Sequence, residues 1–197
     1  MTNFHRVARH TALIGGVALL GLCSLNATAI GVDVKGFYTT KSLDKGDWGS
    51  DLATQSAYGV GVDVDVPVLP FDITAAMIFL NSSEERTVNG VKQTHELSGR
   101  ELQLGILKGF APLVEVIRPY LGGGITNSSM DYTVEIGNDK TTKEYNDTGY
   151  WGSAGVQVNF AGLQLSYDIR RAFYPEDSET KRGLSGSYQS FTFGYRF

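Results

Sequence analysis

The sequence has very little cysteine, few basic residues and, beyond its first thirty residues, no long apolar segment. Cys23 is the single cysteine of 197 residues, so no disulfide can form within the chain. After residue 29 no run of about twenty apolar residues occurs, which argues against a transmembrane helix in that part of the chain. The 17 Lys and Arg are outnumbered by 21 Asp and Glu, a balance that argues against a nucleic-acid partner. The length suits one domain.

The first 29 residues predict an export signal. An apolar run at residues 12–22 is too short to span a membrane as a helix, and Ala27-Thr28-Ala29 supplies an A-x-A cleavage site. The run follows a basic or weakly basic start made by His5, Arg6, Arg9 and His10. We therefore expect residues 1–29 to be a cleaved signal peptide and residues 30–197 to form the mature domain. An uncleaved amphipathic anchor is the alternative.

Cys23 raises the separate possibility of a lipoprotein, which would be cut immediately before a lipid-modified cysteine. Leu22 precedes it, however, and a large side chain departs from the small residue usual at that point of a lipoprotein signal. Cleavage after Ala29 is the better interpretation. It removes two Arg and no acid, which changes the formal net charge from −4 to −6 and leaves no cysteine.

From Ile30 onward, apolar residues alternate with small or polar ones, as expected for β-strands with two different faces. The alternation is clearest at residues 58–66, where Tyr and Val alternate with Gly and Asp. Segments of this kind lie at residues 32–38, 58–66, 71–79, 102–110, 117–125, 150–160, 163–173 and 190–197. The pattern predicts about eight strands in a single all-β domain. Asn89-Gly90 predicts a hairpin tip, and the alternating Tyr132, Val134 and Ile136 predict a hairpin that continues beyond a membrane.

The connections between these segments alternate in length. Short ones lie at residues 67–70, 111–116 and 161–162, whereas long polar ones, interpreted as loops, lie at 41–55, 81–99, 127–146 and 174–186. This is the arrangement of a membrane barrel with short periplasmic turns and long outer loops. The polar face of the strands is rich in Gly and Ser, which suits the narrow interior of a small barrel.

Aromatic residues on the apolar face gather near the two ends of the strands. One set lies beside the short turns (Phe71, Phe110, Phe160 and Phe197), and the other lies towards the long loops (Tyr38, Tyr58, Phe79, Tyr150 and Phe173). Two such sets are typical of the girdles at the two interfaces of a membrane. The apolar face is therefore predicted to point outward. A soluble, lipocalin-like barrel, with that face turned inward, is the alternative.

The final segment places Phe191, Phe193, Tyr195 and Phe197 on one face of a strand. This ending resembles the terminal assembly signal of bacterial outer-membrane barrels. The stretch Arg118-Pro119-Tyr120-Leu121-Gly122-Gly123-Gly124-Ile125 is similar to the Pro-Tyr plus alternating-Gly strand of the small eight-stranded OmpA/OmpX-type family. Tyr150-Trp151-Gly152-Ser153-Ala154-Gly155-Val156 resembles that family's next strand.

The resemblance implies an eight-stranded antiparallel up-and-down transmembrane β-barrel in the outer membrane of a Gram-negative cell, with both termini in the periplasm. It implies a monomer whose partners are membrane lipids, lipopolysaccharide, the barrel-assembly machinery and periplasmic chaperones. A peptidoglycan-binding domain, present in longer OmpA proteins, is not implied. At the outer rim, Arg171 is a candidate contact for lipopolysaccharide phosphates, although a solvated rim charge is the simpler interpretation.

Successive side chains of a strand point to opposite faces, so the charged residues that alternate with the apolar ones are predicted to form a network in the lumen. Its members are Asp33, Lys35, Asp63, Asp65, Asp72, Glu101, Arg118, Asp168, Arg170 and Arg196. One interpretation is a plug of ion pairs and hydrogen bonds, and the other is a narrow polar path with a slight acidic excess that favours small cations. Tyr120 and Trp151 also point inward, which disfavours a wide pore.

We expect no enzymatic activity, cofactor or metal. His95 is the only histidine after residue 29, and no zinc or calcium-loop spacing occurs. The expected role is structural or surface-interacting, with a largely filled lumen. The alternatives are a narrow, weakly cation-preferring channel, or an adhesin whose loops at residues 84–96 and 132–145 present strand edges to an unknown partner.

Overall fold

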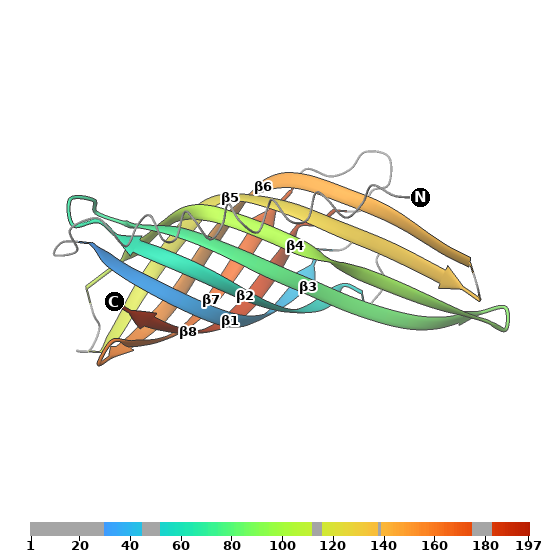
Figure 1. The fold of residues 1–197 in the computed structure, drawn as a ribbon, viewed down its shortest axis with the longest axis horizontal. Coiled ribbons are helices and arrows are strands. Elements are labelled where there is room, and N and C mark those ends of the chain that lie inside the picture. Colours follow the sequence, from blue (N-terminus) through green and yellow to red (C-terminus); the bar gives the residue numbers. More distant parts are fainter. Residues whose placement is uncertain (1–29, 45–51, 112–115, 138, 175–182) are drawn as a thin grey trace, which may run out of the picture. The chain divides into compact units, whose positions relative to one another are not determined.

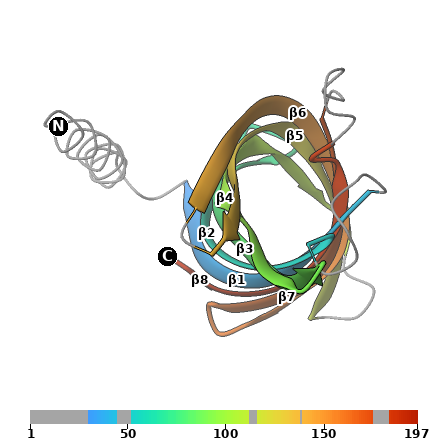
Figure 2. The same ribbon diagram turned by 90° about the vertical axis from the view of Figure 1, so that its right-hand side faces the viewer.

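The computed structural model describes residues 30–44, 52–111, 116–137, 139–174 and 183–197. Eight antiparallel strands pair in sequence order, and β8 pairs with β1 to close a barrel (Figures 1 and 2). The strands are β1 Gly31–Leu43, β2 Thr54–Asp65, β3 Asp72–Val88, β4 Val91–Gly109, β5 Ile117–Ile136, β6 Asp139–Phe160, β7 Leu163–Phe173 and β8 Gly186–Arg196. All lie in one compact unit, Gly31–Phe197. The predicted eight-stranded fold is confirmed, whereas the predicted signal peptide, residues 1–29, lies outside the described residues.

The barrel turns its apolar face outward. In β4 the exposed positions are Leu102, Leu104 and Ile106, and the alternate positions Glu101 and Gln103 are buried. This alternation follows from the two-residue period of a strand, and it confirms the predicted inside-out arrangement. Among the described residues, no helix is long and apolar enough to cross a membrane.

Two of the tight turns use a positive backbone angle at both central residues. The φ angles are 53° and 79° at Asn89 and Gly90, and 49° and 83° at Ala161 and Gly162. Positive φ at both positions characterises the type I′ turn, whose twist matches that of the flanking strands. The hairpin tip predicted at Asn89-Gly90 is therefore present. The predicted turn at residues 111–116 lies partly outside the described residues, since 112–115 are not described.

The hairpin predicted from Tyr132, Val134 and Ile136 is present, formed by β5 and β6, but the interpretation of the long polar stretches as mainly loops was wrong. Residues 81–88 and 91–99 belong to β3 and β4, and residues 127–136 and 139–146 belong to β5 and β6. Lys41 lies in β1 and Gln55 in β2, both fully buried, while residues 45–51 and 175–182 lie outside the described part. Polar residues on both faces indicate contact with water, but they do not prevent the backbone from pairing in a hairpin.

The extra length of β3 to β6 forms a four-stranded sheet that continues the barrel wall. β2 accompanies β3 only as far as Asn81, and β7 accompanies β6 only from Tyr150 onward. Beyond those points β3, β4, β5 and β6 still pair with one another. Figure 1 shows the two hairpins extending past the other strands at one end of the barrel. We call this region the protruding sheet.

Candidate functional site

An apolar layer fills the barrel at the end that carries the protruding sheet. Its side chains come from six strands and from the segments beside β2 and β8, and all are buried: Leu43, Leu52, Leu80, Leu97, Met130, Tyr145, Leu184 and Tyr188. Because these side chains pack against one another across the lumen, this end of the barrel is sealed by hydrocarbon rather than lined by water.

Below this layer, Lys41 and Glu101 form an ion pair in which both side chains are 0% exposed. The Tyr188 hydroxyl donates a hydrogen bond to the second carboxylate oxygen of Glu101. The Lys41 ammonium group lies 5.1 Å from the ring centre of Tyr188 and 5.5 Å from that of Tyr174. The charges are therefore paired, hydrogen-bonded and flanked by aromatic faces, the conditions under which buried charges persist.

This pair differs from what the sequence predicted. Glu101 was expected in the lumen network, but its partner Lys41 was not identified, because residues 41–55 were interpreted as a loop. The donor Tyr188 was not identified either, because the terminal strand was predicted to begin only at Ser190. The signal that reveals Lys41 is the continued alternation of β1, in which Lys35, Phe37 and Thr39 share its parity. Lys41 and Tyr188 are register partners where β1 meets β8, so Glu101 contacts both sides of the closing seam.

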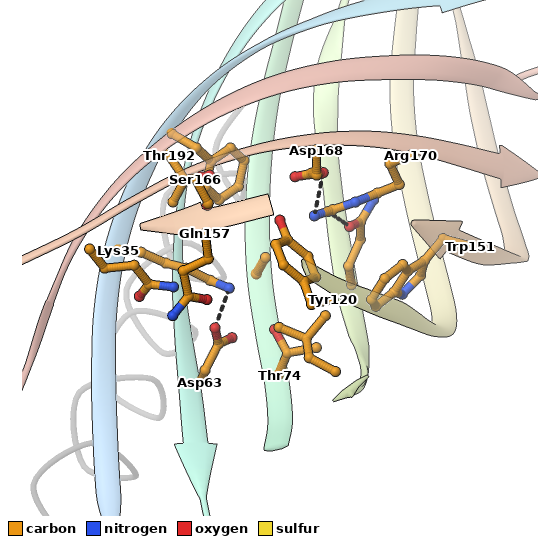
Figure 3. A pocket seen from close by; sticks show the side chains of 15 residues that line it. Lys35, Asp63, Thr74, Tyr120, Trp151, Gln157, Ser166, Asp168, Arg170 and Thr192 are labelled. Carbon is orange, nitrogen blue, oxygen red and sulfur yellow. Dashed lines mark hydrogen bonds and ion pairs between the residues drawn. The ribbon is translucent and has the colours of Figure 1, made fainter. Parts of the chain in front are cut away.

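The middle of the lumen holds a second layer of charges (Figure 3). Lys35 donates to Asp63 at 2.6 Å, and Arg170 contacts Asp168 at 3.5 Å and the side-chain oxygen of Gln103. The Arg170 guanidinium group also lies 4.9 Å from the ring centre of Trp151. In the view of Figure 3, the Tyr120 ring lies between the two ion pairs. These side chains line a cavity of about 20 Å³, room for about one water molecule.

The third layer lies at the short-turn end. Arg196 makes two parallel hydrogen bonds to Asp33, at 2.7 and 2.8 Å, the bidentate geometry that suits a carboxylate. Asp72 and Arg118 line a neighbouring cavity of about 10 Å³, and Arg118 donates to the Phe110 carbonyl at 3.3 Å. Asp65 is half-buried opposite Asp72 in the register of β2 and β3.

The ten charged residues predicted for the lumen thus occupy inward positions, distributed over three layers. The structure brings together Lys35 with Asp63, Arg170 with Asp168, and Arg196 with Asp33. Glu101 pairs instead with Lys41, which was not among the ten. Within the described ranges, no group of three or more His, Cys, Asp or Glu side chains is arranged to hold a metal ion.

The protruding sheet carries its own polar contacts on the face that continues the lumen wall. Arg86 forms a two-point ion pair with Glu84, one contact being 2.7 Å, and this hydrogen bonding lowers the pKa of the Glu84 carboxyl. Nδ1 of His95 lies 2.7 Å from the Tyr132 hydroxyl oxygen. His95, expected in a loop, is therefore part of strand β4.

Residues 15–197 match the sequence profile of the family described as outer membrane protein beta-barrel domain. The chain belongs to this family. Membership accounts for the closed barrel and its outward apolar face, and it supports an outer-membrane location. No curated protein matches the chain by sequence.

Solved structures of other outer-membrane barrels share the fold. The chain is similar to a major outer membrane protein from Thermus thermophilus, with a TM-score of 0.56 and 12% identity over 86% of this chain and 100% of that one. It is also similar to Ail, the attachment invasion locus protein of Yersinia pestis, solved with the heparin analogue sucrose octasulfate (TM-score 0.54, 10% identity, 86% and 100% covered). The N-terminal β-barrel domain of Pseudomonas aeruginosa OprF is similar with a TM-score of 0.52 and 13% identity, over 85% of this chain and 97% of that one. These identities show the fold alone.

The outer surface of this family member has the aromatic groups expected at the two membrane interfaces. Phe191, Tyr38, Tyr58 and Phe79 are successive register partners across β8, β1, β2 and β3. The rings of Tyr58 and Phe79 stack with their centres 5.5 Å apart. At the other end, Phe110, Phe160 and Phe197 are exposed, Phe197 most strongly at 76%. The four aromatics predicted as an assembly signal, Phe191, Phe193, Tyr195 and Phe197, all lie on this outer face.

Two cations on the lipid face, Lys108 and Arg171, lie near opposite rims. Lys108 is exposed and donates to the Pro70 carbonyl beside a short turn. Arg171 pairs with Asp44 at 2.6 Å and donates to the Ser187 hydroxyl at 3.2 Å. Arg171 is therefore already paired to a carboxylate, and an anionic head group would have to displace that contact.

Proposed function

We propose that this protein is a surface-interaction protein of a Gram-negative outer membrane, in which the barrel is the anchor and the protruding sheet is the recognition element. In this proposal residues 1–29 are the export signal, both termini are periplasmic, and the hairpins face the outside of the cell. The observation that supports it best is that two hairpins extend far beyond the strands needed to close the barrel.

The filled lumen supports the role of an anchor. The apolar layer closes one end. Beneath it, the ion pair of Lys41 and Glu101 joins β1 to β4 across the lumen, and Lys35 pairs with Asp63 of the neighbouring strand β2. The two interior cavities named above have volumes of about 20 and 10 Å³, which is too little for a hydrated solute. The barrel therefore suits a structural role better than that of a pore, and we propose no catalytic activity for it.

The protruding sheet suits recognition of an extended polypeptide. Residues 82–85 of β3 and 139–144 of β6 have no strand partner on their outer sides within the described part of the chain. Unpaired strand edges accept further strands through main-chain hydrogen bonds. Near the tip, Val88, Val91 and Ile136 share the lumen-side face and remain 41–47% exposed, so an added strand would also find apolar contacts there.

The remaining surfaces have partners of their own in this proposal. The exposed apolar belt contacts membrane lipids, and lipopolysaccharide surrounds the outer rim, where Arg171 stays paired with Asp44. The terminal aromatics engage periplasmic chaperones and the barrel-assembly machinery. We also propose that the protein is a monomer within its own membrane. The closed ring of eight strands supports this, because it offers no strand edge for pairing at membrane depth.

The test shortens both hairpins and leaves the barrel intact. Replacing residues 83–96 by Asn-Gly joins Ser82 to its register partner Leu97, and replacing residues 134–141 by Asn-Gly joins Thr133 to Thr142. Unboiled gels and membrane fractionation check that the shortened barrel folds and reaches the outer membrane. Attachment of the bacteria to host cells and to extracellular matrix proteins is then measured. Unchanged attachment with a folded, surface-located variant would contradict the proposal.

A narrow, weakly cation-preferring path is the second candidate, favoured by one observation. Asp63 and Gln164, which line the central cavity, each have a buried side-chain oxygen without a hydrogen-bond partner among the described residues. Such oxygens suit water or a small cation. Single-channel recording in planar bilayers tests it. Discrete cation-selective steps, lost in the variant D63N, would support the path, and a silent bilayer would leave the anchor role.

A further inference from the structure

We propose that the partner of the protruding sheet is a second copy of this chain on a neighbouring cell, bound edge to edge through residues 139–144 of β6. This inference rests on the proposed function of the sheet in recognition. The two copies would join their sheets by antiparallel pairing of β6 with β6, a symmetric interface in which the same patch serves both molecules.

The edge itself is available for such pairing. On one side, residues 139–144 pair with residues 131–136 of β5. On the other side, β7 begins to pair with β6 only at Tyr150. The side chains of residues 139–144 are exposed, and within the described ranges neither Lys140 nor Glu144 takes part in an ion pair.

The charges along this edge restrict the symmetric registers that two copies can adopt. When two antiparallel copies are centred on Thr142, Lys140 of each strand lies opposite Glu144 of the other, so two pairs of opposite charge form. Centring on Lys143 would place that lysine opposite itself, and centring on Glu144 would do the same for the glutamate. Centring on Thr141 would also bring opposite charges together, with Asp139 opposite Lys143. The β5 neighbours of those two residues, Ile136 and Tyr132, are uncharged, however, so the register centred on Thr142 is favoured by the charges on β5 as well as by those on β6.

The neighbouring charges on β5 strengthen this selection. In the register of β5 and β6, Asp131 lies beside Glu144 and Glu135 lies beside Lys140, all on the same face of the sheet. Across the proposed interface, the row therefore runs Glu135, Lys140, then Glu144 and Asp131 of the second copy. Lys140 then lies between the carboxylates of Glu135 and of Glu144 from the second copy. The neighbouring carboxylates Asp131 and Glu144 in turn gain Lys140 of the other copy as a counter-ion. On the opposite face, Asp139 lies diagonally from Lys143 of the second copy.

Symmetry determines where the second copy lies. A two-fold axis that relates antiparallel neighbours in one sheet is perpendicular to that sheet. The protruding sheet continues the barrel wall, which stands across the membrane, so the axis runs parallel to the membrane plane and inverts the second barrel. Barrels in one membrane share a single orientation. The contact therefore joins two membranes that face each other, and the protein would promote adhesion between cells that carry it.

A contact of about six residues per strand is short, so a single one is weak. Facing cell surfaces present many copies at once, and each contact that forms raises the effective concentration for the next. The expected behaviour is reversible clumping of cells, which depends on the density of the protein at the surface.

The test uses charge reversal on that edge in cells that lack long surface polysaccharide and are labelled in two colours. Cells with the wild-type protein should clump. The variants K140E and E144K should each lose clumping when present alone, because like charges then oppose each other twice per contact. Mixing K140E cells with E144K cells should restore aggregates, all of mixed colour, because one edge then carries only carboxylates and the other only ammonium groups. The double variant K140E/E144K should again clump with itself.

The control variant is K92E, the same charge reversal on the other hairpin, where Lys92 pairs with Glu85 at 2.8 Å. It should clump like the wild type, and unboiled gels confirm that every variant is folded at equal density. Clumping by K140E alone, or failure of the mixed single variants to aggregate, would overturn the inference. If wild-type cells do not clump while attachment to host material still requires the hairpins, the inference fails and the proposed recognition function stands.

Discussion

Lys41 of β1 and Glu101 of β4 are paired in the interior of the barrel with neither side chain exposed, and the Glu101 carboxylate also accepts a hydrogen bond from Tyr188 of β8. One carboxylate thus contacts side chains on both sides of the β1–β8 seam. The apolar layer above the pair keeps water from taking the place of either partner.

Removing the charge of Glu101 should therefore destabilise the barrel strongly. The substitution E101Q keeps the shape but leaves the Lys41 ammonium group buried without a counter-ion, at a cost of about 3–5 kcal/mol. Urea unfolding in lipid vesicles, followed by the folded band on unboiled gels, should show this as a lower midpoint. The double variant K41M/E101Q removes both charges and still offers Tyr188 an acceptor, so it should regain most of the loss. A double variant no more stable than E101Q would disprove the role of the unpaired charge.

The terminal Phe197 should matter for assembly more than other rim aromatics do. Changing it to Asp disrupts the outer aromatic face of β8, so we expect less folded protein in the outer membrane. The control is F110D, which places the same charge at another exposed aromatic position of the same rim. Quantifying the heat-modifiable band in outer-membrane fractions compares the two. Equal losses would show that lipid exposure, and not the terminal strand, explains the effect.

Glycines on the two faces of the barrel wall should respond differently to a methyl group. A Cβ at Gly124 would overlap the Leu104 carbonyl and the Gly105 backbone, whereas a Cβ at Gly152 would have its nearest neighbour 3.9 Å away, at the Gly122 carbonyl. The variant G124A should lose about 1–3 kcal/mol of stability because its interior is overpacked. G152A should stay within about 0.5 kcal/mol of the wild type. The same urea titration measures both, and an unaffected G124A would contradict the close backbone approach.

The Glu84 carboxyl should titrate below its ordinary value because Arg86 hydrogen-bonds to the charged form. The stabilisation from this lowered pKa is therefore fully present above the ordinary pKa of a glutamate and is lost as the pH falls through the lowered one. Carboxyl chemical shifts of ¹³C-labelled protein in detergent micelles report the titration directly. In the variant R86Q the pKa of Glu84 should return towards its ordinary value. An identical titration curve in R86Q would show that the ion pair does not form.

The sequence was sufficient to predict the architecture because a two-residue period marks both faces of every strand. Val60 and Asp63 lie in one strand with opposite parity, and the choice of face followed from the aromatic residues near the strand ends. The hairpin tip at Asn89-Gly90 was predictable because its turn type has a local signature.

The contacts inside the lumen were not predictable in the same way. Which cation meets which carboxylate depends on the stagger of the strands around the ring, and no local pattern specifies that stagger. Lys41 illustrates the difficulty, because polar neighbours led to its interpretation as a loop residue although its strand continues. The length of the hairpins was underestimated for the same reason.

The pairing of β1 with β8 also has a kinetic consequence. Asp33 and Arg196 are separated by 163 positions in the sequence, and the Phe197 amide donates to the Val32 carbonyl at 2.9 Å. Contacts between such distant segments stabilise the chain only after it has lost much conformational entropy. A high contact order therefore slows folding. Until those contacts form, the nascent sheet has two open edges. Closing the seam between β1 and β8 is therefore expected to be a late and cooperative step, which removes both open edges at once.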